Sequence, residues 1–337
     1  MVRNCYALNF GTMSPSYGLL TYLAWPEYNA GDYIQSLAAA QFLPRVDKYV
    51  NREKLNEYNG NTLKLIMNGW FMHKPGNWPP SADIDPLMIS FHLNSQAKNE
   101  MLNAKGVDWF KQHAPIGCRD IYTLEALTGA GVECYQSGCL TTTFENHYGD
   151  RTDDIYFADV LFRVPGWATS ARTPREFLKA VISGDAFRMN TRNRLLADIF
   201  SVELLEKAKM ISHYHPARHT EKERFTVAES LLKKYATAKL VVTSRLHCAL
   251  PCLAFGTPVI FVHYGFRNDY DICRLDGVTD LFNTIYIDDK ENISSNFGMN
   301  EKIDENITIS NPETFSAGAL RMREICDNFI KDISLQV

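Results

Sequence analysis

The sequence contains no long hydrophobic run. No stretch of about 18 or more consecutive apolar residues occurs, so no transmembrane helix is expected. The first six residues, from Met1 to Tyr6, also lack the apolar centre of a signal peptide. These two absences predict a cytoplasmic protein without a membrane span. Contact with the inner face of the membrane is expected only if the substrate itself is bound there.

The chain also lacks an excess of one charge. Its 35 lysines and arginines nearly balance 39 acidic residues, which gives a net charge of −4, and no block of like charge occurs. This pattern predicts neither a groove for nucleic acid nor a basic face for membranes. An anionic ligand must therefore be held by a few placed groups, because the chain has no general positive field.

The cysteines form no metal-binding pattern. Eight of them are scattered along the chain, several within apolar runs, as expected for small buried side chains in a reducing compartment. Cys248 and Cys252 are four residues apart and could share one face of a helix. No Cys-x-x-Cys or His-x-x-x-His partner completes a zinc set, so we expect neither a metal nor another cofactor.

What the sequence does contain is a regular alternation of strand-like and helix-like segments, which is typical of an α/β protein. A length of 337 residues favours two domains, and we place the boundary in the polar segment 146–153, with domains at 1–150 and 151–337. In the first half the predicted strands are Asn4–Phe10, Leu63–Asn68, Leu87–Phe91 and Pro115–Arg119, the helices are Gly31–Leu43 and Asp120–Thr128, and Glu133–Phe144 turns into a further strand.

The second half contains the clearest local unit. It reads as strand, helix, strand, helix and strand within about fifty residues, which favours parallel strands. Its predicted segments are Lys209–Tyr214, Glu221–Ala238, Leu240–Thr243, Ser244–Phe255 and Pro258–Val262. Before it we expect a strand in Asp154–Phe162 and helices at Pro174–Ile182 and Thr191–Ala208. The terminal helix, Pro312–Ile330, is long enough to cross back over the other domain.

An anion site is predicted where strand Leu240–Thr243 ends. Ser244 is expected to cap the next helix, whose first turn offers N–H groups and a positive dipole end. Arg245 and His247 are two residues apart, so both reach one ligand only if they lie in that first turn. The same two residues could instead cap a carbonyl or pair with a carboxylate. Pro251 should kink this helix in either case.

Six short motifs in the chain resemble those of one enzyme family. They are Asn29-Ala30-Gly31-Asp32, Ile66-Met67-Asn68-Gly69-Trp70, Ile89-Ser90-Phe91-His92, Ile116-Gly117-Cys118-Arg119-Asp120, Ser244-Arg245-Leu246-His247 and Phe255-Gly256-Thr257-Pro258-Val259-Ile260. Their order and spacing resemble the polysaccharide pyruvyltransferase family. The sequence departs from that pattern at Cys118, where an aliphatic residue is common, and at Gln136-Ser137-Gly138-Cys139, where the family has Pro-Asp.

The resemblance implies two Rossmann-like domains that face each other across a cleft, as in GT-B glycosyltransferases. It also implies that the enzyme moves the pyruvyl group of phosphoenolpyruvate to a pair of sugar hydroxyls, forming a ketal and releasing phosphate. The expected acceptor is a galactose-type residue of a lipid-linked glycan or polysaccharide precursor. The N-terminal domain would hold the acceptor and the C-terminal domain the donor, with no nucleic acid as partner.

The chemistry of this reaction suggests roles for the candidate residues. The donor would be bound by Gly31, Arg119, Ser244, Arg245 and His247. The catalytic candidates are Arg245, His247 and His213, and the acceptor candidates are Asp32, Asn68, Trp70 and His73. Other interpretations remain open: Arg119 could pair with Asp120, Asp32 could simply favour a helix start, and Trp70 could belong to the core.

Three further features bear on the cleft. His92, at a strand end, is better interpreted as a structural histidine, and His215 shares a strand face with His213 without a third metal ligand nearby. The loop with Arg267, Asn268, Asp269 and Asp271 is expected to line the same cleft.

Two other functions share this scaffold: a GT-B glycosyltransferase that uses a nucleotide sugar, and a non-catalytic sugar-phosphate binding protein.

Overall fold

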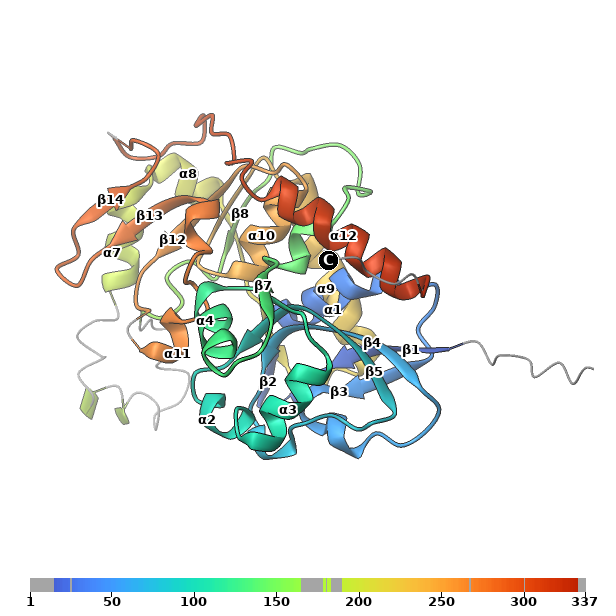
Figure 1. Cartoon of the computed structure of the whole chain (residues 1–337). Helices are drawn as coiled ribbons and strands as arrows, with labels where there is room; N and C mark the ends of the chain where they lie inside the picture. The colour runs from blue at the N-terminus through green and yellow to red at the C-terminus, as the bar shows by residue number, and fades with distance from the viewer. Residues whose placement is uncertain are drawn as a thin grey trace, which may run out of the picture.

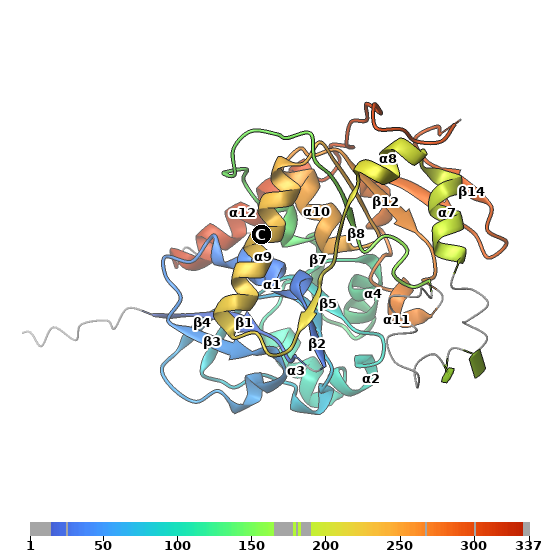
Figure 2. The same ribbon diagram turned by 180° about the vertical axis from the view of Figure 1, so that it is seen from behind.

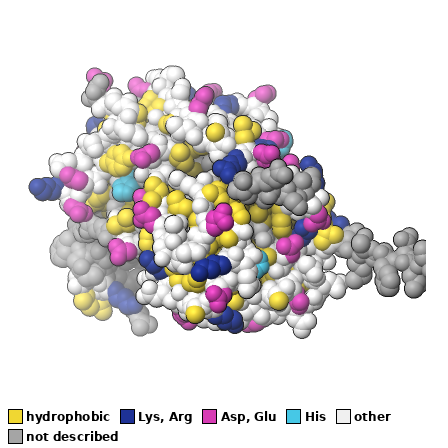
Figure 3. Space-filling model, viewed as in Figure 1, with side chains coloured by type: hydrophobic (Ala, Val, Ile, Leu, Met, Phe, Trp, Pro, Cys, Tyr) yellow, Lys and Arg dark blue, Asp and Glu magenta, His cyan; other side chains and the backbone are white. Residues whose placement is uncertain are grey.

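Two six-stranded sheets form the framework of the protein (Figure 1). The computed structural model describes residues 15–24, 26–164, 178–179, 181–182, 190–266, 268–299 and 301–332. Within these residues, no helix combines the length and apolar character that a membrane crossing requires. On the face seen in Figure 3, positive and negative side chains are interspersed, in keeping with the balanced charge of the sequence.

The first sheet consists of parallel strands. Their spatial order is β3 (Lys48–Asn51), β1 (Ser16–Thr21), β4 (Leu63–Phe71), β5 (Ile84–Leu93), β6 (Ile116–Cys118) and β7 (Cys134–Gln136). All nine residues of β4 are buried, which explains its nearly continuous apolar sequence. The accompanying segments are α1 (Ala30–Ala40), η1 (Arg52–Glu57), η2 (Pro75–Asn77), α2 (Lys98–Met101), α3 (Ala104–Gln112), α4 (Ile121–Gly129) and η3 (Leu140–Thr143).

The second sheet is parallel except at one edge. Its order is β14 (Ile293–Ser295), β13 (Asn283–Ile287), β12 (Val259–His263), β11 (Leu240–Thr243), β8 (Ile155–Ala158) and β9 (Lys209–Ile211), with β14 antiparallel. Helices α9 (Glu221–Thr237) and α10 (Leu246–Ala254) pack on one face, and α7 (Thr191–Ile199) and α8 (Val202–Lys207) on the other. The short segments α11 (Asp269–Ile272) and η5 (Thr279–Leu281) lie between β12 and β13 in the sequence.

Each sheet has a point at which the strand order reverses direction. In the first sheet the chain places β3 on one side of β1 and β4 on the other. In the second sheet β9 and β11 flank β8 in the same way. Ligands of open α/β sheets bind beyond the carboxyl ends of the strands at such points. The topology therefore predicts one binding region per sheet, at β1/β4 and at β8/β11.

Several contacts join the two halves. Strands β2 (Glu27–Asn29) and β10 (Tyr214–Pro216) form a two-stranded antiparallel ribbon with one strand from each half. Helix α9 lies along α1 (Figure 2), where the rings of Tyr33 and Phe225 are 5.1 Å apart. The terminal helix α12 (Ser316–Ile330) crosses back and buries Met322 and Cys326 in the apolar cluster on one face of the first sheet.

The sequence predicted the fold class correctly. The protein is an α/β protein with two Rossmann-like sheets, and its terminal helix crosses back over the other half. The division at residue 150 stays a prediction, although the two sheets lie on either side of it. The predicted strand Asn4–Phe10 and most of the predicted helix Pro174–Ile182 lie outside the described residues.

Several predicted segments were too long, and three of them show the physical reason. The strand Lys209–Tyr214 is divided between β9 and β10, which belong to different sheets. The helix Thr191–Ala208 is interrupted because Phe200 is extended and pairs with Ile303, after which the Ser201 hydroxyl accepts a hydrogen bond from the Leu204 N–H and begins α8. The strand expected in Glu133–Phe144 ends at Gln136, and 3₁₀-helix η3 follows.

Candidate active site

A cavity of about 570 Å³ lies where the carboxyl ends of both sheets meet. The first half contributes Asp32 at the start of α1, Trp70 and His73 near the end of β4, and Arg119 directly after β6. The second half contributes segments that follow β8, β9, β11 and β12, including His213, Ser244, Arg245, Leu246 and His247. The cavity thus lies at the places where strand order reverses, and it brings together most of the predicted site residues.

Positive charge dominates the wall of this cavity. Arg119, Arg163, Arg245 and Arg274 line it, whereas Asp32 and Glu27 are the carboxylates in its lining. Arginine forks suit carboxylate and phosphate groups because two N–H groups can reach two oxygens at once. The cavity therefore fits an anionic ligand, although the protein as a whole carries a net negative charge.

Arg245 is held from three sides. Its Nε donates to Asp159 Oδ2 over 2.9 Å, and its guanidinium carbon lies 3.7 Å from the ring centre of Phe162 and 4.4 Å from that of Tyr214. In the described part of the chain, its buried Nη2 has no hydrogen-bond partner. The alternative role of Arg245, as the partner of a carboxylate, is therefore present at Nε. Nη2 remains available to a ligand.

The prediction that Ser244 caps helix α10 was wrong. The N-cap position belongs to Arg245, and no side chain makes a capping hydrogen bond there. The Ser244 hydroxyl instead donates to the Val262 carbonyl over 2.7 Å and accepts the Leu161 N–H over 3.1 Å. The Ser244 hydroxyl thus provides a hydrogen-bond partner for two backbone groups near the strand ends, where the backbone hydrogen bonds between strands stop. Ser244 lines the cavity, but its hydroxyl is already engaged.

His247 lies in the first turn of α10, as the spacing predicted, and Pro251 shapes that turn. His247 is the one residue of α10 with non-helical backbone angles, φ −81° and ψ 16°. A proline cannot donate to the carbonyl four residues before it and its ring crowds that carbonyl, which here is that of His247. The expected kink therefore falls at His247 itself.

The imidazole of His247 is neutral. Its buried Nε2 has no hydrogen-bond partner among the residues that the structure describes. Burial, followed by the positive charge of Arg119, holds the pKa of His247 well below its usual range. A neutral imidazole with a free ring nitrogen can accept a proton.

Arg119 is a buried arginine with a free guanidinium. It is 2% exposed, and across the described ranges none of its three side-chain nitrogens makes a hydrogen bond. Its Nε lies 3.3 Å from Asp120 Oδ2, so the predicted alternative of an ion pair with Asp120 is present as well. Arg119 also forms part of the wall of a second cavity of about 180 Å³. A buried arginine without hydrogen bonds is costly, and one that lines a cavity has its donors available to a ligand there.

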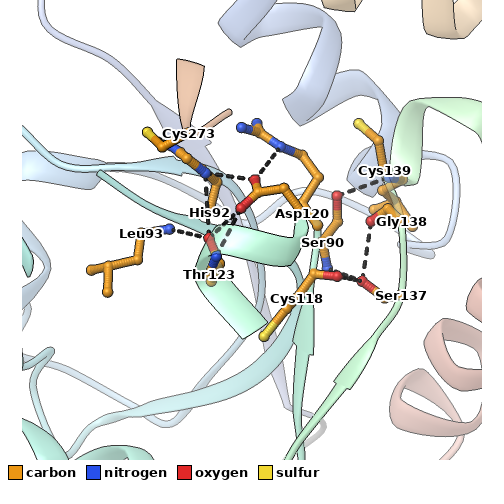
Figure 4. Close-up of polar contacts among 12 residues, drawn as sticks. Ser90, His92, Leu93, Cys118, Asp120, Thr123, Ser137, Gly138, Cys139 and Cys273 are labelled. Atoms are coloured by element: carbon orange, nitrogen blue, oxygen red, sulfur yellow. Dashed lines mark hydrogen bonds and ion pairs between the residues drawn. The ribbon is translucent and has the colours of Figure 1, made fainter. Parts of the chain in front are cut away.

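Asp120 is fixed by its own network (Figure 4). Its Oδ1 accepts hydrogen bonds from the N–H and hydroxyl of Thr123 and so caps α4, and His92 Nδ1 lies 2.6 Å from its Oδ2. Burial lowers the pKa of His92 to about 4, so the neutral ring donates to the carboxylate. Its Nε2 lies 3.9 Å from Cys273 Sγ. These contacts agree with the interpretation of His92 as a structural histidine.

His213 connects the two halves beside the cavity. Its Nε2 and the Tyr235 hydroxyl are 2.7 Å apart, its N–H donates to Asp159 Oδ2, and its carbonyl accepts the Ala30 N–H over 2.8 Å. A Cβ on Gly31 would lie 3.0 Å from His213 Nδ1 and 3.4 Å from His247 Cβ. Gly31 therefore lets the start of α1 approach both histidines.

Asp32 is free of helix capping because Asn29 performs that task. The Asn29 side chain accepts the Gly31 N–H over 3.0 Å, whereas Asp32 accepts from Gln35 Nε2 over 3.2 Å and lines the cavity. Burial raises the pKa of Asp32, although nearby Arg52 and His73 act in the opposite direction. The Asp32 carboxyl group therefore retains a proton more readily than an exposed aspartate.

The predicted acceptor residues are only partly brought together. Trp70 lines the cavity at 8% exposure, its ring centre is 4.4 Å from that of His73, and Arg52 lies 4.8 Å over its ring. Asn68 is buried in the interior, where its Nδ2 donates to the Gln35 carbonyl over 2.8 Å and joins β4 to α1. Asn68 thus supports the cavity wall from behind.

Several residues at the site were missed or only partly anticipated. The predicted loop contributes through Tyr270 and Arg274, since Asn268 caps α11 and Asp271 pairs with both Arg163 and Arg274. Arg267 lies outside the described residues. Asp159 and Phe162 follow β8 and were not singled out, because their partners are distant in sequence. In the described ranges, no group of three or more His, Cys, Asp or Glu could hold a metal ion.

Comparisons with known proteins give matches of two kinds. The model of the polysaccharide pyruvyl transferase family matches residues 29–265, which is more than half of the chain. Among solved structures, an uncharacterized protein from Klebsiella pneumoniae subsp. pneumoniae NTUH-K2044 is similar over 79% of this chain and 89% of its own, with 14% identity and a TM-score of 0.41. No curated protein matches the chain.

Proposed function

Because the chain belongs to the polysaccharide pyruvyl transferase family, an enzyme family, we propose that it transfers the pyruvyl group of phosphoenolpyruvate to two hydroxyl groups of one sugar. The product is a pyruvate ketal, and inorganic phosphate is released. The proposed acceptor is a galactose-type residue of a lipid-linked glycan or polysaccharide precursor. We place the reaction in the cytoplasm, with peripheral contact at the inner membrane face when the acceptor is membrane-bound.

The observation that supports this donor is a pair of buried arginines in the cavity lining, one from each half of the protein. Arg119 follows β6 of the first sheet and Arg245 follows β11 of the second, and in the described chain both have buried nitrogens without hydrogen bonds. Phosphoenolpyruvate carries a phosphate and a carboxylate, so each arginine can bind one of them. Arg163 and Arg274 add positive charge on the side of Arg245.

The reaction requires one proton at C3 of the donor and the removal of two hydroxyl protons. Protonation of C3 makes C2 electrophilic, one sugar hydroxyl adds to C2, phosphate leaves, and the second hydroxyl closes the ring. The pKa values of His247 and Asp32 are moved in opposite directions, down for His247 and up for Asp32. Such a separation suits a base and an acid at neutral pH. We therefore assign removal of the hydroxyl protons to His247 and delivery of the proton to C3 to Asp32, with His213 beside them.

The sugar would bind on the side of the first sheet. Trp70 lines this part of the cavity, the ring centre of Tyr270 from the second half lies 6.0 Å from that of Trp70, and His73 packs on Trp70. Aromatic faces suit the apolar faces of sugar rings, and the Asp32 carboxyl can hydrogen-bond a hydroxyl group. The acceptor hydroxyls would then lie between Asp32 and His247, where the donor carbon must be.

Mass spectrometry tests the proposal directly. Candidate galactosides are incubated with phosphoenolpyruvate and the enzyme, and the products are examined for an added pyruvyl ketal while released phosphate is measured. Arg119→Ala and Arg245→Ala serve as controls that should give neither product. Thermal stabilisation by nucleotide sugars but not by phosphoenolpyruvate, with no phosphate released from any acceptor, would refute the proposal in favour of a glycosyltransferase.

A further inference from the structure

Asp159 occupies an unusual backbone position at the second sheet. It directly follows β8, the strand at which the order of the sheet reverses, and has a left-handed φ of 48°. Such angles are uncommon for residues other than glycine, and aspartate and asparagine tolerate them best. Non-glycine residues held in this region cluster at functional sites.

One oxygen of Asp159 connects two candidate catalytic residues. Asp159 Oδ2 accepts the Nε–H of Arg245 and the backbone N–H of His213, each over 2.9 Å. The carboxylate side chain is 10% exposed and that of Arg245 is 9% exposed. Burial acts to raise the pKa of Asp159, but Arg245 and His213 outweigh it, so the pKa lies below its usual range. Asp159 is therefore ionised at neutral pH.

These contacts leave the Arg245 guanidinium little freedom to move. Its Nε is tied to Asp159, and its faces pack on Phe162 and Tyr214. Its Nη1 lies 3.5 Å from the Tyr214 hydroxyl, and in the part of the chain that the structure describes Nη2 has no partner. The guanidinium is thus fixed at one edge, while the other edge stays available to an anion in the cavity.

We propose that Asp159 is a positioning residue that orients Arg245 for the donor anion. The assignment of that anion as phosphoenolpyruvate rests on the proposed function, but the orientation of Arg245 does not. A buried ion pair contributes little net stability, because desolvation of both charges offsets their attraction. The Asp159–Arg245 pair is therefore not explained by stability, whereas orientation of the guanidinium does explain it.

The same oxygen also aligns the two walls of the cavity. The His213 N–H donates to Asp159, and the His213 carbonyl accepts the Ala30 N–H at the start of α1. Asp32 lies two residues further along α1 and lines the cavity. Asp159 therefore fixes Arg245 relative to the segment that presents Asp32, in addition to fixing it within its own sheet.

The test measures binding of phosphoenolpyruvate, and of inorganic phosphate as a second probe, by calorimetry. Asp159→Asn removes the charge and retains a residue that tolerates the left-handed backbone, and it should raise the dissociation constant of phosphoenolpyruvate about tenfold. Asp159→Glu keeps the charge but displaces the carboxylate, and it should weaken binding as well. Asp154→Asn is the matched control, because Asp154 precedes the same strand at its other end and pairs with Lys209.

A double-mutant cycle separates positioning from a structural role. If Asp159 acts through Arg245, Asp159→Asn should have no further effect on binding in an Arg245→Ala background. An equal loss in both backgrounds, or wild-type affinity in a folded Asp159→Asn or Asp159→Glu variant, would overturn the proposal. If the wild type binds phosphate but not phosphoenolpyruvate, the proposed donor is wrong, and the coupling is then measured with phosphate. Binding of neither anion would overturn both.

Discussion

Replacement of His247 by glutamine tests the proposed base most directly. Glutamine can place an amide nitrogen near the position of Nε2 and can donate a hydrogen bond there, but it cannot accept and release a proton. A positioned acid or base contributes about 10²–10⁴-fold to a rate. Because the ring is neutral and its Nε2 is buried without a partner in the described chain, we expect kcat to fall at least about a hundredfold, or roughly 2.7 kcal/mol of activation free energy.

The assay is steady-state phosphate release at saturating acceptor, with phosphoenolpyruvate varied. The Michaelis constant of the donor should change much less than kcat, because the arginines that bind the anion remain. His113→Gln is the matched control: His113 follows α3, its Nδ1 contacts the Trp109 carbonyl, and it belongs to neither cavity wall. A His247→Gln enzyme with near-normal turnover at saturating donor would refute the proton-transfer role and leave only binding.

The pH dependence provides an independent reading of the same group. A base whose pKa is depressed stays active as the pH falls through its ordinary value, about 6.5. The acid limb of kcat/KM due to His247 should therefore lie below that pH. A bound phosphate favours the protonated ring, so the corresponding limb of kcat should lie at higher pH. Comparison with His247→Gln removes the contribution of the donor's own phosphate ionisation.

Three other changes have definite expected outcomes. Arg119→Met should raise the dissociation constant of phosphoenolpyruvate about thirtyfold in calorimetry, since the guanidinium that would bind the anion is removed, and thermal unfolding should show a lower stability, because buried Asp120 loses its ion-pair partner; unchanged affinity in a folded variant would contradict this. Dialysis against EDTA should leave phosphate release unchanged, and a loss restored by one metal would reveal a site that we missed. His92 has a pKa of about 4 in the folded protein and about 6.5 in the unfolded chain. Between these two pH values only the unfolded chain takes up the proton, so the free energy of unfolding of the wild type should fall by about 3 kcal/mol as the pH falls from about 6.5 to about 4. In urea unfolding, the stability advantage of the wild type over His92→Gln should therefore shrink by that amount over this range, and a constant difference would contradict it.

The strand ends explain why much of the site could be predicted. Leu240–Thr243 is a short apolar run followed by polar residues, which marks the carboxyl end of a buried strand. Once parallel strands are inferred, residues just beyond their ends must converge, as Arg119, His213 and Arg245 do. The position of His247 followed from its distance to Arg245 in the sequence.

The missed features depend on contacts between distant segments. The left-handed turn at Asp159 contains no glycine, so the sequence gives no signal for it. The hydrogen-bond partners of Asp159, His213 and Arg245, are far from it in the sequence. The Ser244 hydroxyl favoured a helix cap by local rules, but the unpaired Leu161 and Val262 backbone groups are nearer and bind it instead. Local spacing cannot show which of two competing partners a hydroxyl group will take.

The β2–β10 ribbon determines how the two walls of the cavity can move. Any separation of the sheets that keeps its three backbone pairings, from Tyr214–Asn29 to Pro216–Glu27, must turn about the ribbon as a hinge line. Arg245 packs on Tyr214 beside that line, so Arg245 would keep its position relative to the ribbon in such a motion. Trp70 and Tyr270 lie on opposite sides of the gap, and the distance between them changes more. The ribbon therefore limits how far the two walls can separate beside Arg245, and it limits the separation of Trp70 from Tyr270 less.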